Sequence, residues 1–162
     1  MKVEVLFKDQ KVDTKIRKIV VKVVNLVCTY LSVNHKHIEL SVLLVNDKFM
    51  QNLNLKYRNK FETTNVLSFP QNKHLVWSNS EKLNLLGDIV LSPDKIKEES
   101  VMYLRDFYEH FIHIFLHGFL HLLGYTHDSE NDTINMETKE IEILSLLNIN
   151  NPYLPHTEKD EK

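Results

Sequence analysis

The stretch His117–His127 has the sequence HGFLHLLGYTH, in which three histidines are spaced H-x3-H-x5-H. In a helix His117 and His121 lie on one face, because residues i and i+4 are neighbours there. Gly124 is suited to end such a helix, since glycine adopts the left-handed conformation of a helix C-terminus at little cost. The reversal that follows turns His127 back toward the other two histidines. The stretch therefore predicts a long helix with a three-histidine metal site at its end.

Zinc is the metal that fits this set of ligands best. Imidazole nitrogens bind zinc at about 2.0–2.1 Å, and a catalytic zinc ion typically has three protein ligands and a fourth position for water. We therefore expect His117, His121 and His127 to bind one Zn²⁺ ion of the catalytic rather than the structural kind.

Two further histidines, His110 and His113, precede the motif on the same predicted helix. His113 and His121 cannot both reach one ion, because eight residues rise about 12 Å along a helix. Only the pair His117 and His121 is followed by a glycine turn and another histidine. We expect His113 to serve packing or to support a ligand, and His110 to be a partly exposed helix residue.

The rest of the sequence alternates between strand-like and helical patterns. Apolar and β-rich runs predict strands over residues 3–7, 38–45, 66–69 and 85–91. Apolar residues at helical spacing predict helices over residues 12–31, 46–57, 93–103, 104–123 and 132–147, and allow a break between the third and fourth. Asn46 and Ser92 are placed to cap two of these helices. This order predicts an α+β fold in which a small mixed β-sheet is covered by helices, with the metal site at the end of a long helix.

The length and composition are those of a globular protein. The chain of 162 residues suits one domain, which we place at residues 1–152, and a charged tail at 153–162 is expected to be disordered. There is no apolar run near the roughly 18–20 residues of a membrane span, and no signal peptide is recognisable. The single cysteine excludes an intramolecular disulfide, so we expect a cytoplasmic protein without a membrane partner. With a net charge of −2, any contact with nucleic acid must be local.

The histidine spacing is that of the metzincin zinc peptidases, H-E-x-x-H-x-x-G-x-x-H, with one difference. Residue 118 is glycine here, whereas the peptidases have a glutamate that takes a proton from zinc-bound water. Because Gly118 has no side chain for that step, peptidase chemistry is disfavoured.

Two other motifs accompany the histidines. Residues 57–70 read YRNKFETTNVLSFP, and residues 86–89 read LGDI. With these motifs and HGFLHLLGYTH, nearly the whole chain resembles the YbeY-type rRNA maturation factors, whose patterns are Y-R-x-K-D-x-P-T-[DN]-V-L-S-F-P, L-G-D-I and H-G-x-L-H-L-x-G-Y-D-H. Two differences stand out. Phe61-Glu62-Thr63 replaces Asp-x-Pro, and Thr126 replaces the aspartate before the third histidine.

The resemblance implies a zinc-dependent, single-strand-specific endoribonuclease. It implies that His117, His121 and His127 hold the zinc ion and that Arg58 stabilises charge at phosphorus, and these four residues form the expected catalytic set. A planar, permanently charged guanidinium suits a phosphate. From the residue alone, however, Arg58 is more simply a solvated arginine at a helix end.

The resemblance also implies a role in rRNA maturation, including 16S rRNA 3′-end processing, and in ribosome quality control. The implied partners are single-stranded RNA or rRNA and the ribosome or ribosomal small-subunit proteins. Two other functions remain open. One is a zinc-stabilised, non-catalytic ribosome-assembly module, and the other is a zinc peptidase or amidohydrolase that uses a distant carboxylate.

Several residues near these motifs are left outside the catalytic set. Lys56 and Lys60 either attract the RNA backbone or belong to a solvated face. Tyr57 and Phe69 are expected to pack in the core rather than to stack on bases. Asp88 is either a carboxylate that faces the site or an edge or turn residue, and the sequence leaves both readings open.

Overall fold

Four strands form one mixed β-sheet in the computed structural model, which describes residues 1–71 and 84–154. They are β1 (Lys2–Lys8), β2 (Ile38–Val45), β3 (Val66–Pro70) and β4 (Asn84–Leu91). Their order across the sheet is β1-β2-β4-β3. Strand β2 runs parallel to both β1 and β4, whereas β3 is antiparallel to β4.

Five α-helices accompany the sheet in the described part of the chain. They are α1 (Thr14–Tyr30), α2 (Asp47–Arg58), α3 (Pro93–Met102), α4 (Phe107–Leu122) and α5 (Glu130–Leu146), and a short 3-10 helix, η1 (His35–His37), precedes β2. A capping side chain accepts a hydrogen bond from a backbone N–H in the first turn of each α-helix: Asp13, Asn46, Ser92, Asp106 and Ser129. The predicted α+β fold with a small mixed sheet is confirmed, as are the predicted caps at Asn46 and Ser92.

The boundaries around α4 and α5 differ slightly from the prediction. Leu104 has a φ of 54° and Asp106 caps α4, so this helix begins at Phe107 rather than at residue 104. Helix α5 begins at Glu130 rather than at residue 132, because Ser129 provides its cap. In both cases the cap, and not the apolar pattern, sets the first residue.

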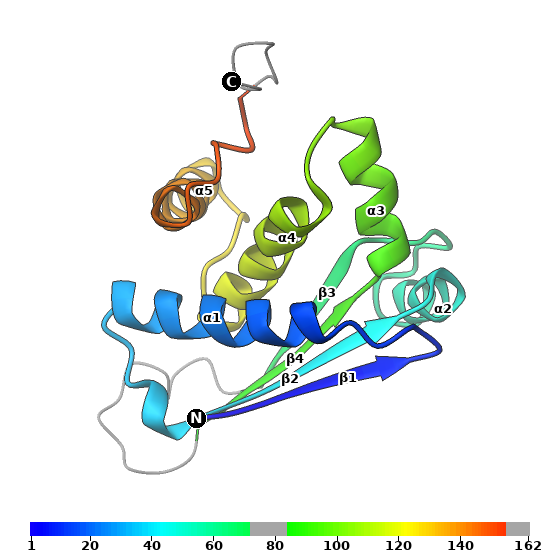
Figure 1. Ribbon diagram of the computed structural model, residues 1–162, viewed down its shortest axis with the longest axis horizontal. Helices are drawn as coiled ribbons and strands as arrows, with labels where there is room; N and C mark the ends of the chain where they lie inside the picture. Colours follow the sequence, from blue (N-terminus) through cyan, green and yellow to red (C-terminus); the bar gives the residue numbers. More distant parts are fainter. Residues whose placement is uncertain (72–83, 155–162) are drawn as a thin grey trace.

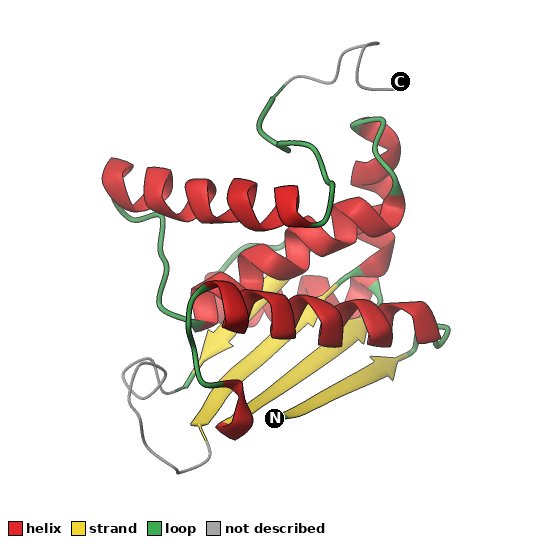
Figure 2. Cartoon of the chain, turned by 60° about the vertical axis from the view of Figure 1, so that its left-hand side comes forward, coloured by secondary structure: helices red, strands yellow, loops and turns green. Residues whose placement is uncertain are grey.

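Helices α1 and α4 cover one face of the sheet (Figure 1, Figure 2). Because side chains alternate along a strand, Val42 and Leu44 of β2 point to the same face. These two belong to the main buried cluster together with Val20 of α1 and with Phe115 and Phe119 of α4. Helix α5 contacts both α4 and α1 and lies on their outer side (Figure 1).

Helix α2 packs on the opposite face of the sheet. Its Met50 is fully buried in a second, smaller cluster with Val45, Leu67 and Val90, which come from β2, β3 and β4. Strand β3 therefore has α2 on one side and α4 on the other.

Gly118 allows α4 to lie directly on β3. A Cβ atom at this position would be 3.0 Å from Ser68 Oγ and 3.1 Å from Val66 Cγ2, both on β3. Ser68 Oγ donates a hydrogen bond of 3.1 Å to the carbonyl oxygen of Gly118. This contact fixes the height of the histidine-bearing helix above the sheet.

No helix within residues 1–71 and 84–154 is both long and apolar enough to cross a membrane. The predicted charged tail at residues 153–162 lies largely outside the described residues. At the described end of the chain, residues 151–154 form a turn that returns to α4 and α5, and Tyr153 donates a hydrogen bond to Glu140.

Candidate metal centre and cleft

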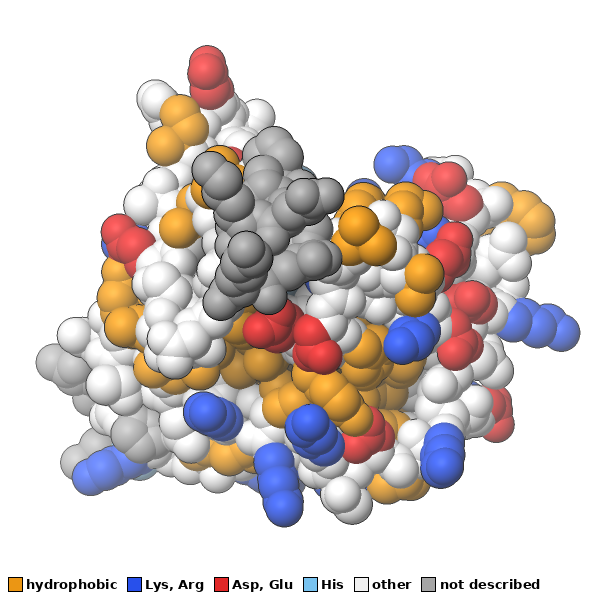
Figure 3. Space-filling model, turned by 45° about the horizontal axis from the view of Figure 1, so that its top comes forward, with side chains coloured by type: hydrophobic (Ala, Val, Ile, Leu, Met, Phe, Trp, Pro, Cys, Tyr) orange, Lys and Arg blue, Asp and Glu red, His pale blue; other side chains and the backbone are white. Residues whose placement is uncertain are grey.

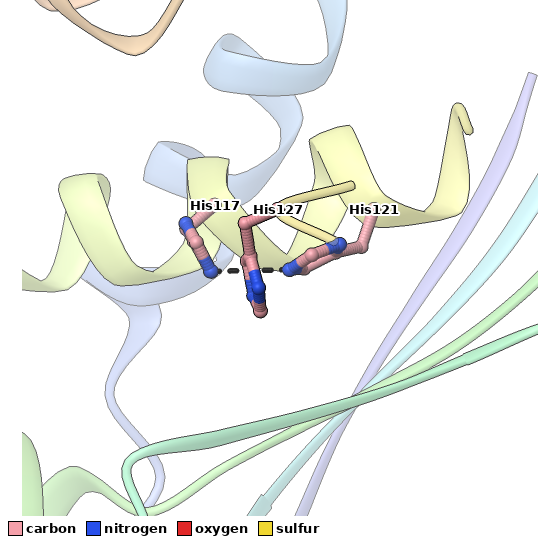
Figure 4. Close-up of side chains that lie close together, drawn as sticks. All are labelled: His117, His121 and His127. Carbon is pink, nitrogen blue, oxygen red and sulfur yellow. Dashed lines mark hydrogen bonds between the residues drawn. The ribbon is translucent and has the colours of Figure 1, made fainter. Parts of the chain in front are cut away.

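The three histidines of the motif converge at the C-terminal end of α4. His117 and His121 come from the helix and His127 from the segment that follows it, and the three imidazoles point toward one another (Figure 4). One ligand nitrogen of each lies within 4.8 Å of those of the other two. His117 and His121 are half-buried, and His127 is exposed. The structure thus brings together all three predicted ligands.

Gly124 makes this convergence possible. Its φ of 102° lies in the region that favours glycine. The backbone N–H of Gly124 donates to the carbonyl of His121, and that of Tyr125 donates to the carbonyl of Leu120, both at 3.0 Å. These two bonds are those of a Schellman motif, which ends the helix and reverses the chain toward His127. The predicted role of Gly124 as the residue that ends the helix is confirmed.

The second nitrogen of each helical histidine is already engaged. His121 Nδ1 lies 2.9 Å from the carbonyl oxygen of Tyr125, and His117 Nδ1 lies 2.6 Å from Glu140 Oε1. Both acceptors require a proton on Nδ1, so each neutral imidazole presents a bare Nε2.

The two bare nitrogens face each other. His117 Nε2 and His121 Nε2 are 3.1 Å apart. Two lone pairs at this distance repel each other unless both bind the same cation. Tetrahedral zinc with bonds of about 2.0–2.1 Å brings imidazole nitrogens to a similar separation. The donor set therefore fits a zinc ion, which His117, His121 and His127 would hold.

The environment also keeps His121 neutral. Burial, together with the neighbouring His117, lowers the pKa of His121 below its ordinary value. A lowered pKa leaves the imidazole unprotonated at neutral pH, which is the form that binds a metal.

Glu140 of α5 contacts one of the candidate ligands and was not predicted from the sequence. Its side chain is fully buried, and it is the carboxylate that accepts from His117. Burial alone would raise the pKa of Glu140, but the hydrogen bonds from His117 and Tyr153 lower it, so the group is charged at neutral pH. A signal was present in the sequence. Glu140 follows Met136 by four residues and precedes Ile143 by three, so it is a charge on the apolar stripe of the last predicted helix.

Arg58 opens onto the same cleft as the histidines. It is the last residue of α2 and is exposed, with no ion pair among the described residues. The cleft has a volume of about 510 Å³. Its lining residues come from the end of α2, from β3 and the segment before it, and from the histidine motif: Arg58, Thr64, Asn65, Val66, Leu67, Ser68, Pro70, Ile114, His117, His121, Tyr125, Thr126 and His127. Two motifs about sixty residues apart in the sequence thus share one cavity.

The remaining histidines of α4, His110 and His113, are not part of the three-histidine cluster. His113 is largely buried and contacts Tyr153, which agrees with the expected packing role. His110 was expected to be partly exposed, and this prediction is wrong because its side chain is only 4% exposed. Its Nε2 lies 3.0 Å from Glu99 Oε1 of α3, so a carboxylate of the neighbouring helix makes burial of the imidazole favourable.

Other residues near the motifs are placed as follows. Tyr57 is 56% exposed, so the expectation that it packs in the core is wrong. Its ring makes an edge-to-face contact with the ring of Phe69. Phe69 is half-buried and packs against the smaller cluster, as expected. Asp88 lies in β4, paired with Ser41 of β2, and is not among the described residues that line the cleft.

The fold and site together define an α+β protein with a candidate three-histidine metal centre and an arginine in one cleft. The family model of endoribonuclease YbeY matches residues 3–148 of the chain. The chain belongs to the endoribonuclease YbeY family, as its motifs predict.

Individual relatives agree with this assignment. The chain is 42% identical to an endoribonuclease YbeY from Colwellia psychrerythraea over 116 residues, which cover 72% of each protein. It is 39% identical to the one from Bartonella quintana over 125 residues, covering 76% of this chain and 77% of the relative. A Thermotoga maritima protein with a known solution structure has the same fold, with a TM-score of 0.58 at 19% identity over 90% of this chain and 91% of the other.

Proposed function

We propose that this protein is a zinc-dependent endoribonuclease that cuts single-stranded RNA. Membership of the endoribonuclease YbeY family supports a hydrolase that acts on RNA. The observation that carries the proposal is the shared cleft, in which the three histidines and Arg58 line one cavity. A metal centre that shares a cleft with an exposed guanidinium is suited to a phosphodiester.

Each group in the cleft has a separate task. A zinc ion bound by the three histidines supplies a Lewis acid for a phosphoryl oxygen or for water. Arg58 binds the phosphate and stabilises the negative charge that develops on its oxygens. Strand β3 contributes to the lining of the same cleft, and its Ser68 is held by a hydrogen bond to α4.

The contact with RNA is local in this proposal. On the face shown in Figure 3, Lys and Arg side chains alternate with Asp and Glu side chains and with hydrophobic ones. This mixed surface agrees with the net charge of −2 and provides no extended basic track there. Arg58, with Lys56 and Lys60 beside it in the sequence, supplies the positive charge at the cleft.

The proposed biological role is the one that resemblance to the family implies. We propose that the RNA is ribosomal, that cutting serves rRNA maturation at the 3′ end of 16S rRNA and ribosome quality control, and that the protein works in the cytoplasm with ribosomal small-subunit proteins. Peptidase chemistry is less well supported, because Gly118 stands where the peptidases have their glutamate and no carboxylate is among the described residues that line the cleft.

The test is RNA cleavage by the purified, Zn²⁺-loaded protein. The substrate is a single-stranded RNA, compared with the same RNA paired to its complement. The variants are His121→Ala and Arg58→Ala. Arg17→Ala is the matched control, because Arg17 of α1 contacts the ring of Phe7 in β1 and is not among the described residues that line the cleft. We expect the wild type and Arg17→Ala to cut only the single strand, and both site variants to lose about a hundredfold or more in rate.

Two results would contradict the proposal. One is a wild-type protein that leaves single-stranded RNA intact, and the other is a pair of site variants that cut as fast as the wild type. Tight binding of RNA without cutting would favour the non-catalytic assembly module instead. Arg58 is exposed, so its loss leaves the core unchanged, and Arg58→Ala stays informative if His121→Ala unfolds.

A further inference from the structure

We infer that Glu140 and Tyr153 are positioning residues of the metal centre, which hold the His117 imidazole so that its Nε2 faces the ion. The inference rests on the proposed function only in that the three histidines bind a metal. The two residues come from α5 and from the segment after it, both of which follow the histidine motif in the sequence.

The two oxygens of the Glu140 carboxylate have separate partners. Oε1 accepts from His117 Nδ1 at 2.6 Å, and Oε2 accepts from the hydroxyl of Tyr153. With one donor on each oxygen, the carboxylate cannot rotate without losing a hydrogen bond. Since Glu140 is fully buried, no water replaces a lost donor at low cost.

Tyr153 is itself fixed from several sides. Its backbone N–H donates to Asn151 Oδ1 at 2.9 Å, and the carbonyl of Pro152 next to it accepts from the guanidinium of Arg105. The ring meets that of His113 edge to face, with centroids 5.6 Å apart. The short segment 151–153 thus holds the tyrosine hydroxyl against Glu140 from outside α5.

This arrangement decides which nitrogen of His117 is available. A carboxylate beside Nδ1 keeps the proton there, so that Nε2 remains unprotonated and points to His121 and His127. Without the carboxylate, the imidazole loses the partner that selects its tautomer and ring orientation. The C-terminal segment therefore acts on the metal through two hydrogen bonds in series and touches neither the ion nor the RNA.

The experiment changes one polar group at a time in the 162-residue chain. Tyr153→Phe deletes only the hydroxyl, at a residue that is 43% exposed, so we expect this variant to fold. Glu140→Gln keeps the shape of the side chain and removes its charge. Tyr108→Phe is the matched control, because Tyr108 donates a comparable hydrogen bond of 2.9 Å to the carboxylate of Asp13, away from the metal centre.

Two quantities are measured for each variant. Zn²⁺ affinity is obtained by competition with a chelating dye, and the tautomer of His117 in the metal-free protein by a long-range proton–nitrogen NMR spectrum. We expect Tyr153→Phe to lower the affinity about tenfold and Glu140→Gln to lower it by about tenfold to a hundredfold. In both variants the proton of His117 is expected to be shared between Nδ1 and Nε2. Tyr108→Phe is expected to match the wild type in both measurements.

Unchanged Zn²⁺ affinity and an unchanged His117 tautomer in both variants would overturn the inference. An equal loss of affinity in Tyr108→Phe would also overturn it, since the effect would then be one of general stability. A wild type that binds no Zn²⁺ removes the inference along with the metal centre. A wild type that binds Zn²⁺ but cuts no RNA contradicts only the proposed function, because neither measurement depends on cutting.

Discussion

Gly118 lies where α4 crosses β3, directly after the first histidine of the motif. From the sequence, its missing side chain argues against the peptidase mechanism. The structure adds a packing reason for the same residue, since a Cβ atom would also be 3.3 Å from Ile89 Cγ2. A glycine that serves the contact between helix and sheet cannot be exchanged for the peptidase glutamate without moving the ligands on either side.

We expect Gly118→Glu to destabilise the protein by about 3 kcal/mol or more, because it forces a charged side chain between packed layers. Gly118→Ala is expected to cost less, since the gain in helix propensity of about 1 kcal/mol offsets part of the crowding. Both values are measured as the free energy of unfolding in urea. Asn135→Glu, at an exposed position of α5, is the control and should change stability little. Equal stability of Gly118→Glu and the wild type would show that the contact is not tight.

At the level of helices and strands, local sequence patterns predicted the elements and their ends. They did not predict the side-chain contacts between one element and another. The strands, the caps at Asn46 and Ser92, and the turn at Gly124 follow from period and propensity, which act over a few residues. The burial of His110 and the role of Glu140 depend on the packing of α3 and α5 against α4, which no local pattern contains. Arg58 was assigned through resemblance, because a lone arginine at a helix end carries little information.

The turn after α2 exposes an aromatic side chain close in sequence to Arg58. Asn59 has a φ of 54° and ends the helix directly after Arg58. Asn54 Nδ2 donates to the carbonyl of Glu62 at 2.8 Å, which ties the following residues back to the helix. Phe61 is 69% exposed in this turn, where the family pattern has an aspartate. An exposed aromatic ring near Arg58 and Lys60 is suited to stack on a base.

We expect Phe61→Asn to weaken binding of single-stranded RNA by about 1–3 kcal/mol through lost stacking, with the same salt dependence as the wild type. Phe61→Asp adds a negative charge beside Lys60 and Arg58, so it should bind still more weakly and show a smaller dependence on salt. The measurement is the affinity for a short RNA at several salt concentrations, with metal removed to prevent cutting. Phe61→Leu is a useful comparison because it keeps an apolar side chain without a ring. If all three variants bind as the wild type does, Phe61 has no part in the contact.

For the molecule as a whole, buried ionisable groups link α3, α4, α5 and the C-terminal segment. Glu99 pairs with His110, and Glu140 pairs with His117 and lies 4.0 Å from His113. Burial lowers the pKa of His113 to about 4, even though Glu140 acts in the opposite direction, so this imidazole is neutral at neutral pH. Burial alone would raise the pKa of Glu99, but its hydrogen bonds from His110 and Asn65 lower it. His113, Glu99 and Glu140, whose pKa values are lowered, therefore bind fewer protons in the folded protein than in the unfolded chain as the pH falls.

Stability should therefore decrease in acid, and His113 sets the upper part of the range. Its folded pKa of about 4 lies below the ordinary value of 6.5, so between these pH values the unfolded chain binds the extra proton and folding loses free energy as the pH falls. The shift corresponds to about 3 kcal/mol for this one group, and the carboxylates Glu99 and Glu140 extend the loss below the ordinary pKa of glutamate.

We expect the free energy of unfolding, measured in urea with a chelator present, to be nearly constant above pH 7 and to fall steadily toward pH 4. His113→Gln should reduce the slope of the curve between pH 6.5 and about pH 4. The loss of stability at lower pH, which comes from the carboxylates, should remain. A variant with the same slope as the wild type between pH 6.5 and pH 4 would assign the loss to other groups.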